Sequence, residues 1–428
     1  MLDLRRIRED PEGARAALER RDPELGRALE RVLTLDSRWR SATGAAETLR
    51  AQQREQSERI AGGKRAGEDV SSELELMKAV SAEVKARTEE ARAAEEQLQA
   101  ALALLPNLPD PGAAAGPEDE VVRVVGEVPE LAFAARDHVA LAGAMIDIER
   151  AAALSGSRFA YLKGQLVTLE LVLVSWALSK LAGHGFEPVI PPVLVRERAL
   201  FGTGFLPDTE QQIYRVTDDE LYLIGTSEVA LASLHDGEIL EGERLPLRYA
   251  GFSPCFRREA GTAGKDTHGI FRVHQFDKVE MFSFVAPPDS PAEHERILAI
   301  EEEILGELEL PYRVVNIAVG DLGGSAAKKY DCEVWLPSEG RYRELTSCSN
   351  TTDYQARRLN IRLRPPRAGG AGKGTETLHT LNGTAVAVGR TLIALLENGQ
   401  REDGSVRLPA ALVEHGAPAT LPSQVGSA

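Results

Sequence analysis

Two stretches of the sequence decide the fold: Phe256-Arg257-Arg258-Glu259-Ala260-Gly261 and, after a polar loop, Arg272-Val273-His274-Gln275-Phe276-Asp277-Lys278-Val279-Glu280-Met281-Phe282. Their pattern predicts two strands joined by a charged loop. Because side chains alternate between the two faces of a strand, one face of the pair carries Arg257, Glu259, Arg272, His274, Phe276, Lys278 and Glu280. Such a face suits a nucleotide, since guanidinium groups bind phosphates and aromatic rings stack on bases. For this stretch alone, the alternative is a solvated hairpin held by cross-strand ion pairs.

The chain beyond this hairpin mixes short β-branched runs with helical stretches. The β-branched runs include residues 187–190, 221–224 and 312–317, and a helical pattern covers residues 293–308. Turns separate most of the strands, which predicts an antiparallel sheet in an α+β domain. The most apolar stretch, 166–178, is shorter than the roughly 20 residues that a membrane-spanning helix needs. We therefore interpret it as a core helix.

Composition places the chain among globular proteins. It has 428 residues, and 50 Lys and Arg against 66 Asp and Glu give a net charge of −16. This charge argues against non-specific adhesion to nucleic acid or anionic lipid. Three cysteines without a Cys-x-x-Cys pair favour free thiols in a reducing compartment. The amino terminus becomes charged at once instead of carrying the apolar stretch of a secretory signal, so we expect a cytoplasmic protein with no membrane partner.

Residues 28–105 have the heptad spacing of a coiled coil, with mostly apolar or small residues, and a few polar ones, alternately three and four positions apart. The glycine-containing stretch 61–67 separates two such seams, and Pro106 ends the second. This predicts an antiparallel helical hairpin with its turn at 61–67, within an arm of residues 1–105. Periodicity alone favours a dimerisation or spacer element. Basic side chains along the hairpin could also meet phosphates, although acidic residues interleave with them.

Two further segments bear on domain organisation. Residues 106–130 are rich in Pro, Gly, Ala and acidic residues, so we interpret them as a linker to a catalytic domain of residues 131–428. Residues 369–375 look like a P-loop, but Arg367 occupies the position of its first glycine, and Gly374 follows Lys373 where Ser or Thr is required. We interpret them as an ordinary loop. No Gly-x-Gly-x-x-Gly follows a strand in a βαβ setting, so a Rossmann site has no support.

The two opening stretches resemble motif 2 of the class II aminoacyl-tRNA synthetases, most closely its seryl-tRNA synthetase form. Four other segments resemble, in chain order, motif 1, the serine-binding loop, a strand of the active site and motif 3: Gly185-Phe186-Glu187-Pro188-Val189-Ile190-Pro191-Pro192, Ile224-Gly225-Thr226-Ser227-Glu228, Arg343-Glu344-Leu345-Thr346-Ser347-Cys348-Ser349-Asn350 and Leu381-Asn382-Gly383-Thr384-Ala385-Val386-Ala387-Val388-Gly389-Arg390-Thr391. The resemblance covers nearly the whole chain. It implies an α+β fold in which a class II antiparallel β-sheet domain with helices follows a long antiparallel α-helical coiled-coil hairpin.

The resemblance also implies an activity. ATP would activate L-serine to seryl-adenylate, and serine would then pass to the 3′ end of serine tRNA, with selenocysteine tRNA as a further candidate substrate. The catalytic residues would be Arg257, Glu344 and Arg390, and Mg²⁺ would bind Glu344 and Ser347 with the nucleotide. Residues matching the family's ATP contacts are Arg257, Arg258, Glu259, Val273, Phe276, Glu344, Leu345, Thr346, Ser347 and Arg390.

The residues that match the family's serine contacts are Thr226, Ser227, Glu228, Arg257, Glu280, Asn382 and Thr384. A buried carboxylate that accepts from the serine hydroxyl would reject alanine, which leaves that acceptor unpaired. Taken alone, Thr226 and Ser227 fit ordinary helix capping. The chain departs from the commoner family pattern at Leu345-Thr346, where Ile-Ser is usual, and at Thr384, where many relatives carry Ser. It lacks the Cys and His ligands of the archaeal zinc site, so we expect no zinc.

The implied partners follow from the same motifs. Motif 1 implies a homodimer, and the arm implies contact with the long variable arm of serine tRNA. One alternative is a specialised or resistance copy of the enzyme. Another is an amino acid:carrier-protein ligase, although such relatives lack the arm. A non-catalytic coiled-coil protein on an inactive scaffold should have lost one of Arg257, Glu259, Glu344 or Arg390, and all four are present.

Overall fold

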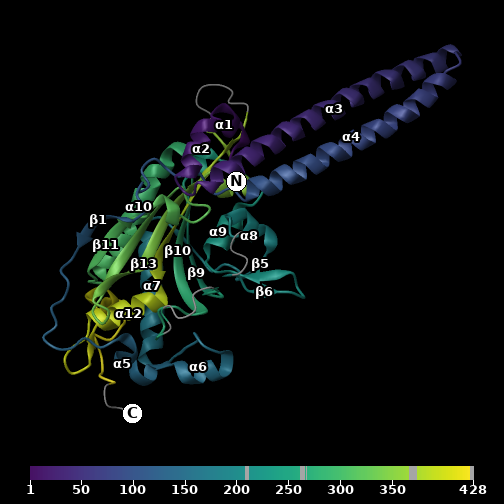
Figure 1. Ribbon diagram of the computed structural model, residues 1–428. Coiled ribbons are helices and arrows are strands. Elements are labelled where there is room, and N and C mark those ends of the chain that lie inside the picture. The colour runs from purple at the N-terminus through teal and green to yellow at the C-terminus, as the bar shows by residue number, and fades with distance from the viewer. Residues whose placement is uncertain (208–211, 261–265, 267, 366–373, 425–428) are drawn as a thin grey trace. The chain divides into compact units, whose positions relative to one another are not determined.

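The chain forms two compact units, Leu2–Pro106 and a second unit made of Met1 with Asn107–Ala428. The computed structural model describes residues 1–207, 212–260, 266, 268–365 and 374–424 (Figure 1). Gly261 and residues 369–373 of the expected loop lie outside the described residues.

The first unit is the helical hairpin that the heptads predicted. Two short helices, α1 (Leu4–Glu9) and α2 (Pro11–Glu19), precede the long helices α3 (Glu24–Ala66) and α4 (Ser71–Ala103). The long helices run side by side in Figure 1, and Gln53 Nε2 donates to Ser81 Oγ across them at 2.9 Å. At 1.5 Å per residue, the 43 residues of α3 extend about 65 Å. The antiparallel hairpin is confirmed.

The predicted turn of this hairpin is in the wrong place. α3 continues through Gly62 and Gly63 and ends at Ala66, with Gly67 as its left-handed cap at φ 77°. A Cβ on Gly63 would lie 2.8 Å from Val70 Cγ1. Gly63 therefore provides the space that the returning chain needs, and only Gly67 provides the backbone conformation of the turn.

The second unit is built on an eight-stranded sheet, with strand order β1-β11-β12-β13-β16-β10-β9-β4. Neighbouring strands are antiparallel except for β4 and β9. In chain order the strands are β1 (Glu120–Val125), β4 (Glu187–Val189), β9 (Leu247–Phe256), β10 (Gln275–Val285), β11 (Tyr312–Asn316), β12 (Lys328–Leu336), β13 (Arg341–Thr352) and β16 (His379–Ala387). The α+β class and the antiparallel catalytic sheet are confirmed.

Three helices pack on this sheet: α7 (Gln165–Gly183), α10 (Ser290–Glu307) and α12 (Val388–Asn398). Their apolar side chains join those of the strands in the largest core, which includes Leu169, Ile297 and Leu392. By length and composition alone, α7 is long and apolar enough to cross a membrane, contrary to the prediction made from the shorter stretch 166–178. In the structure Leu166, Leu169 and Leu173 of α7 are buried, as in a core helix.

Shorter elements complete the second unit. The helices are α5 (His138–Ala142), α6 (Ile148–Ser155), α8 (Glu197–Thr203), α9 (Glu228–Ala232), α11 (Tyr354–Arg358) and α13 (Ala410–Glu414). The strands are β2 (Ile146–Asp147), β3 (Tyr161–Leu162), β5 (Leu194–Arg196), β6 (Arg215–Val216), β7 (Leu221–Leu223), β8 (Ile239–Glu241), β14 (Arg362–Arg364), β15 (Glu376–Thr377), β17 (Val406–Arg407) and β18 (Thr420–Leu421). α9 and α11 contribute Leu231 and Ala356 to a second core, which also holds Phe282 and Phe284 of β10.

The expected linker is partly structured. Within residues 106–130, the strand β1 pairs with β11 at the edge of the large sheet. Its Val-Val-Arg-Val-Val sequence has the β-branched residues of a strand. The composition of the whole segment is dominated by Pro, Gly, Ala and acidic residues, so it did not indicate this short strand.

The strands of the opening hairpin are shorter than predicted. β9 ends at Phe256 and β10 begins at Gln275, so Arg257, Glu259, Arg272 and His274 lie in the connection. Backbone pairing continues for one step, since the Arg257 amide donates to the His274 carbonyl at 2.9 Å. Glu259, in the connection, takes φ 50°, a left-handed conformation that departs from extended backbone.

Two β-bulges decide which side chains share a face. Between β12 and β13 the register shifts so that Leu345 is the extra residue, and between β10 and β16 the extra residue is Ala385. An extra residue reverses the alternation of side chains along the strand. Glu344 therefore faces the same side as Ser347, although an odd number of positions separates them.

Candidate active site

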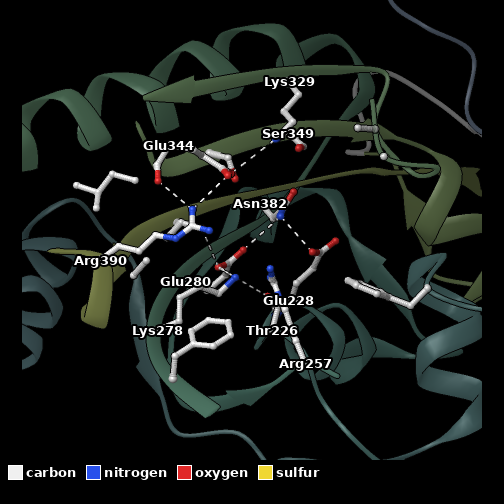
Figure 2. Close-up of a pocket in the computed structure, with 18 of the residues that line it drawn as sticks. Thr226, Glu228, Arg257, Lys278, Glu280, Lys329, Glu344, Ser349, Asn382 and Arg390 are labelled. Carbon is white, nitrogen blue, oxygen red and sulfur yellow. Dashed lines mark hydrogen bonds and ion pairs between the residues drawn. The ribbon is translucent and has the colours of Figure 1, made fainter. Parts of the chain in front are cut away.

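A cleft of about 450 Å³ lies over β10, β13 and β16. Glu228, Thr226 and Arg257 lie towards one end of it and Glu344 and Arg390 towards the other, with Glu280 and Asn382 between them (Figure 2). Its charged and polar lining residues include Thr226, Glu228, Arg257, Glu259, Arg272, Lys278, Glu280, Lys329, Glu344, Ser347, Ser349, Asn382, Thr384 and Arg390.

Two buried carboxylates form the polar end of the cleft. Glu228 begins α9 and Glu280 projects from β10, and they are 7% and 1% exposed. Asn382 Nδ2 lies between them, donating to Glu228 at 3.1 Å and to Glu280 at 3.2 Å. The Thr384 hydroxyl donates to Glu280 at 3.4 Å. The Asn382 Oδ1 atom is buried and has no hydrogen-bond partner among the described residues, which leaves an acceptor at this point.

A lysine supplies the counter-charge of this pair. Lys278 Nζ lies 2.5 Å from Glu280 Oε2 and donates to Thr226 Oγ1 at 2.7 Å. The Thr226 hydroxyl oxygen also accepts from the Glu228 amide at 3.2 Å, so the predicted capping contact is made by Thr226. Figure 2 shows the side chains of Lys278, Glu280, Asn382 and Glu228 meeting around one small volume.

Glu228 is the strongly perturbed acid of this group. Burial raises the pKa of its carboxyl to about 7, and the negative charge of Glu280 adds to the rise. Hydrogen bonding from Gln355 and the charges of Lys278 and Arg257 oppose it. A carboxyl with such a pKa gains most from a bound cation, because that cation compensates a charge that the protein has only partly neutralised.

The opposite end of the cleft is built around Glu344 and Arg390. Arg390 Nη1 lies 3.2 Å from Glu344 Oε2, and it donates to the Glu344 carbonyl at 2.9 Å. Burial alone would raise the pKa of Glu344, but Arg390 and Lys329 outweigh it and lower that pKa to about 2. Glu344 is therefore an ionised carboxylate beside two cations, at the edge of the cleft.

Aromatic rings contact the two guanidinium groups of the cleft. The Arg257 guanidinium lies 5.2 Å from the centroid of the Phe276 ring, and its Nε donates to the Gly225 carbonyl at 3.1 Å. Arg390 lies 4.5 Å from the ring of Phe271. These contacts hold the planar cations in fixed orientations.

Comparison with known proteins assigns the family. Residues 213–399 match the model of the tRNA synthetase class II core domain (G, H, P, S and T), and residues 1–109 match that of the seryl-tRNA synthetase N-terminal domain. The chain is 49% identical over 419 residues to a serine-tRNA ligase of Streptomyces coelicolor, with 96% of each chain covered. This chain belongs to the seryl-tRNA synthetase family.

Solved structures agree with this assignment. A seryl-tRNA synthetase of Pyrococcus horikoshii complexed with ATP has a TM-score of 0.93 at 40% identity, with 99% of this chain and 100% of that chain covered. A cytoplasmic serine-tRNA ligase of Naegleria fowleri in complex with AMP has a TM-score of 0.86 at 31% identity, with 99% of each chain covered. The chain is thus a class II aminoacyl-tRNA synthetase, and its similarity to these structures extends over both units.

Most residues that the family resemblance singled out lie together in the cleft. Those lining it are Thr226, Glu228, Arg257, Glu259, Val273, Phe276, Glu280, Glu344, Leu345, Ser347, Asn382, Thr384 and Arg390. Three others are not among its lining residues. The Thr346 hydroxyl donates to Glu301 at 2.9 Å, Ser227 Oγ pairs with Ser253 Oγ at 2.9 Å, and Arg258 is exposed.

Several polar residues of the site were not assigned from the family motifs. Lys278 was expected only on the polar face of the hairpin, while Lys329 and Ser349 of the cleft wall had no assigned role. Alternation along β13 from Ser347 would have found Ser349. Gln355, which donates to Glu228 at 2.7 Å, lies 127 residues away from it in the sequence, so no local spacing points to that contact.

Proposed function

We propose that this chain joins L-serine to ATP, forming seryl-adenylate and pyrophosphate, and then transfers serine to the 3′ end of serine tRNA. The observation that carries the proposal is one cleft that holds the acids Glu228 and Glu280 with Arg257 near Glu228, and Arg390 paired with Glu344 towards the other end. The acids suit the ammonium and hydroxyl groups of serine. The arginines suit the phosphates of ATP.

The chemistry needs no protein nucleophile. The serine carboxylate is ionised at neutral pH and attacks the α-phosphorus, so the protein has to position the reactants and neutralise charge. Arg257 would hold the serine carboxylate and the α-phosphate together, and Arg390 would bind the γ-phosphate. Phe276 would stack on adenine, while Glu259, fixed by Arg272 at 2.6 Å, would accept from the adenine amino group.

The residues at the phosphate end fit a magnesium ion. The low pKa of Glu344 keeps an ionised oxygen ligand available, and the Ser347 side chain lines the same wall. When bound with ATP, Mg²⁺ would neutralise charge on the phosphate oxygens. Glu344 would also orient Arg390, to which it is already paired.

Selectivity for serine would arise at the carboxylate pair. Glu280 accepts from Thr384 at 3.4 Å and could accept a stronger bond from the serine hydroxyl. Alanine would leave this buried acceptor without a donor, which hydroxyl-binding sites convert into discrimination of several powers of ten. Threonine and cysteine would be rejected mainly by their size and fit.

The arm and the exposed apolar face support two further assignments. We infer that the α3–α4 hairpin contacts the variable arm of serine tRNA by shape and phosphates, because the N-terminal family match covers it. We also infer a homodimer through α7 and the segment after β4, where Leu171 and Ile190 are 62% and 81% exposed. A translation enzyme of this kind would act in the cytoplasm.

Charging of bacterial tRNA with radiolabelled serine, in ATP and Mg²⁺, tests this proposal. We expect serine to be attached, and alanine, which lacks the hydroxyl, to be attached at least about a thousandfold less efficiently. Threonine and cysteine, which are rejected by size and fit, should be attached about tenfold to a hundredfold less efficiently. ATP–pyrophosphate exchange with serine but no transfer to tRNA would instead indicate a carrier-protein ligase. Neither exchange nor charging by folded protein would refute the proposal.

A further inference from the structure

Gln355, on α11, touches the serine end of the cleft from behind. Its side chain is 0% exposed, and it is not one of the residues that line the cleft. Nε2 donates to Glu228 Oε1 at 2.7 Å and to the Thr203 carbonyl at 3.2 Å. Its Oε1 accepts from the Thr380 hydroxyl at 2.9 Å, while the Thr351 hydroxyl, 3.4 Å away, donates to the Thr380 carbonyl at 2.7 Å. Both donor positions of the amide are therefore occupied, and its oxygen has a donor.

These contacts fix which end of the amide faces Glu228. A carbonyl and a carboxylate, both acceptors, surround Nε2, while hydroxyl groups surround Oε1. Turning the amide over would place an oxygen against the Thr203 carbonyl and the Glu228 carboxylate. The surroundings of Gln355 thus require it to donate to Glu228.

Glu228 is consequently held at both of its oxygens. Gln355 donates to Oε1, and Asn382 donates to Oε2 at 3.1 Å. Two donors favour the ionised form of a carboxyl over the protonated form. They also fix the rotation of the carboxylate plane, so that the remaining lone pairs have one direction relative to the cleft.

We propose that Gln355 is a positioning residue for serine binding, which keeps Glu228 ionised and oriented as the acceptor of the substrate ammonium without touching the substrate. This inference rests on the proposed assignment of Glu228 to the serine pocket. A glutamine with only a structural role would support folding of α11 and leave the affinity for serine unchanged.

The pH dependence separates these two roles. Burial and the charge of Glu280 raise the pKa of Glu228 to about 7, while Lys278 and Arg257 face it as cations and the Gln355 hydrogen bond lowers the pKa. Removing that bond raises the pKa further. Because the ammonium of serine binds the ionised carboxylate, the acid limb of kcat/KM for serine then moves to higher pH. A smaller folded fraction would scale the whole profile without moving it.

The experiment compares Gln355→Met, which keeps the volume and removes the donors, with wild type in ATP–pyrophosphate exchange by the full-length enzyme. We expect KM for serine to rise roughly tenfold to a hundredfold, the usual effect of losing a hydrogen bond to a charged group. KM for ATP should stay within about twofold, because Gln355 contacts only the serine end. The acid limb should move to higher pH in the same variant.

Gln400→Met is the matched control. Gln400 is also a buried glutamine of this unit, 5% exposed, and its Nε2 donates to the Glu397 carbonyl at 2.8 Å. It is not among the cleft residues, so its loss should lower thermal stability without changing KM for serine. If Gln355→Met does not fold, Thr380→Val removes a donor that orients the amide and should raise KM for serine by a smaller factor.

The outcomes distinguish the inference from the pocket assignment. A folded Gln355→Met enzyme with unchanged KM for serine and an unmoved pH profile would overturn the positioning role. Glu228→Gln tests the pocket separately, because it should raise KM for serine whatever Gln355 does. Unchanged serine affinity in Glu228→Gln would refute the pocket assignment itself.

Discussion

The charges around Lys278 leave Glu228 only partly compensated at the serine end of the cleft. Glu228 and Glu280 contribute two carboxylates, and Lys278, 6% exposed, contributes one ammonium. An ion removed from water requires a counter-charge, and Lys278 is paired with Glu280 at 2.5 Å. Arg257 acts on Glu228 as a second cation, yet the pKa of Glu228 stays raised to about 7, so its charge is only partly compensated. The ammonium of serine would complete the balance, so the free enzyme stores an unfavourable charge that substrate binding relieves.

Lys278→Met should therefore destabilise the free enzyme. Breaking a buried ion pair by removing one partner costs about 3 kcal/mol or more, since the remaining charge is uncompensated. The loss should be largest at pH 8. As the pH falls through the raised pKa of Glu228, about 7, the folded state takes up a proton and the repulsion weakens. Urea unfolding at pH 8 and pH 6 measures this difference.

Lys328→Met is the comparison for that variant. Lys328 lies on β12 with its Nζ 4.6 Å from the Tyr330 ring, and its side chain is 20% exposed. Its removal should cost about 1 kcal/mol or less at both pH values. Equal losses in the two lysine variants would contradict the charge-balance argument.

Sequence motifs predicted which segments line the cleft. They did not predict, for every residue of those segments, whether its side chain faces the cleft. Glu344 and Ser347 were assigned to one site, and both line it. Thr346 between them was assigned there too, yet it bonds to Glu301 on the opposite face. The reason is that Leu345 is the extra residue of a β-bulge, and the position of this bulge depends on how β12 pairs with β13. That pairing is a property of two strands together and is not encoded in either one alone.

Among the elements, the helical hairpin was predicted closely in type and less closely at its ends. The heptad seams gave two antiparallel helices because burial of a regular stripe is a local and repeated signal. The predicted end of α3 was wrong by several residues, because two adjacent glycines are more typical of a turn than of a helix interior. Gly63 instead makes room for Val70, a contact between segments that only the folded hairpin reveals.

Shortening the hairpin should separate activation from transfer. Gln53 and Ser81 face each other at 2.9 Å, so residues 54–80 can be replaced by a short glycine turn without disturbing the pairing below it. We expect ATP–pyrophosphate exchange with serine to stay within about twofold, and kcat/KM for tRNA to fall by roughly tenfold or more as phosphate contacts are lost. Unchanged charging of serine tRNA would exclude the tip from tRNA recognition.

At the scale of the whole molecule, one group of exposed apolar side chains lies near motif 1. Leu171 of α7, Ile190 after β4 and Leu194 of β5 are 62%, 81% and 43% exposed. The buried face of the same helix packs in the main core, so α7 is apolar on both sides. A helix of that kind is typical of one covered by a second subunit.

Placing a charge on this surface should prevent self-association. The chain mass is 46.4 kDa, and light scattering should give about twice that value for the wild type. Leu171→Asp combined with Ile190→Asp should give the mass of one chain, because a buried unpaired carboxylate opposes association. Leu76→Asp on α4, at a side chain 53% exposed, is the control and should leave the dimer intact. A wild-type mass of one chain would refute the dimer.

The bulge at Leu345 limits how this enzyme can change over generations or in the laboratory. Because a single unpaired residue sets which side chains of β13 face the nucleotide, the identity of that residue can vary while the number of residues cannot. Loss or gain of one codon between Glu344 and Ser347 would turn one of these two side chains away from the cleft. Redesign of this segment should therefore exchange residues and preserve its length.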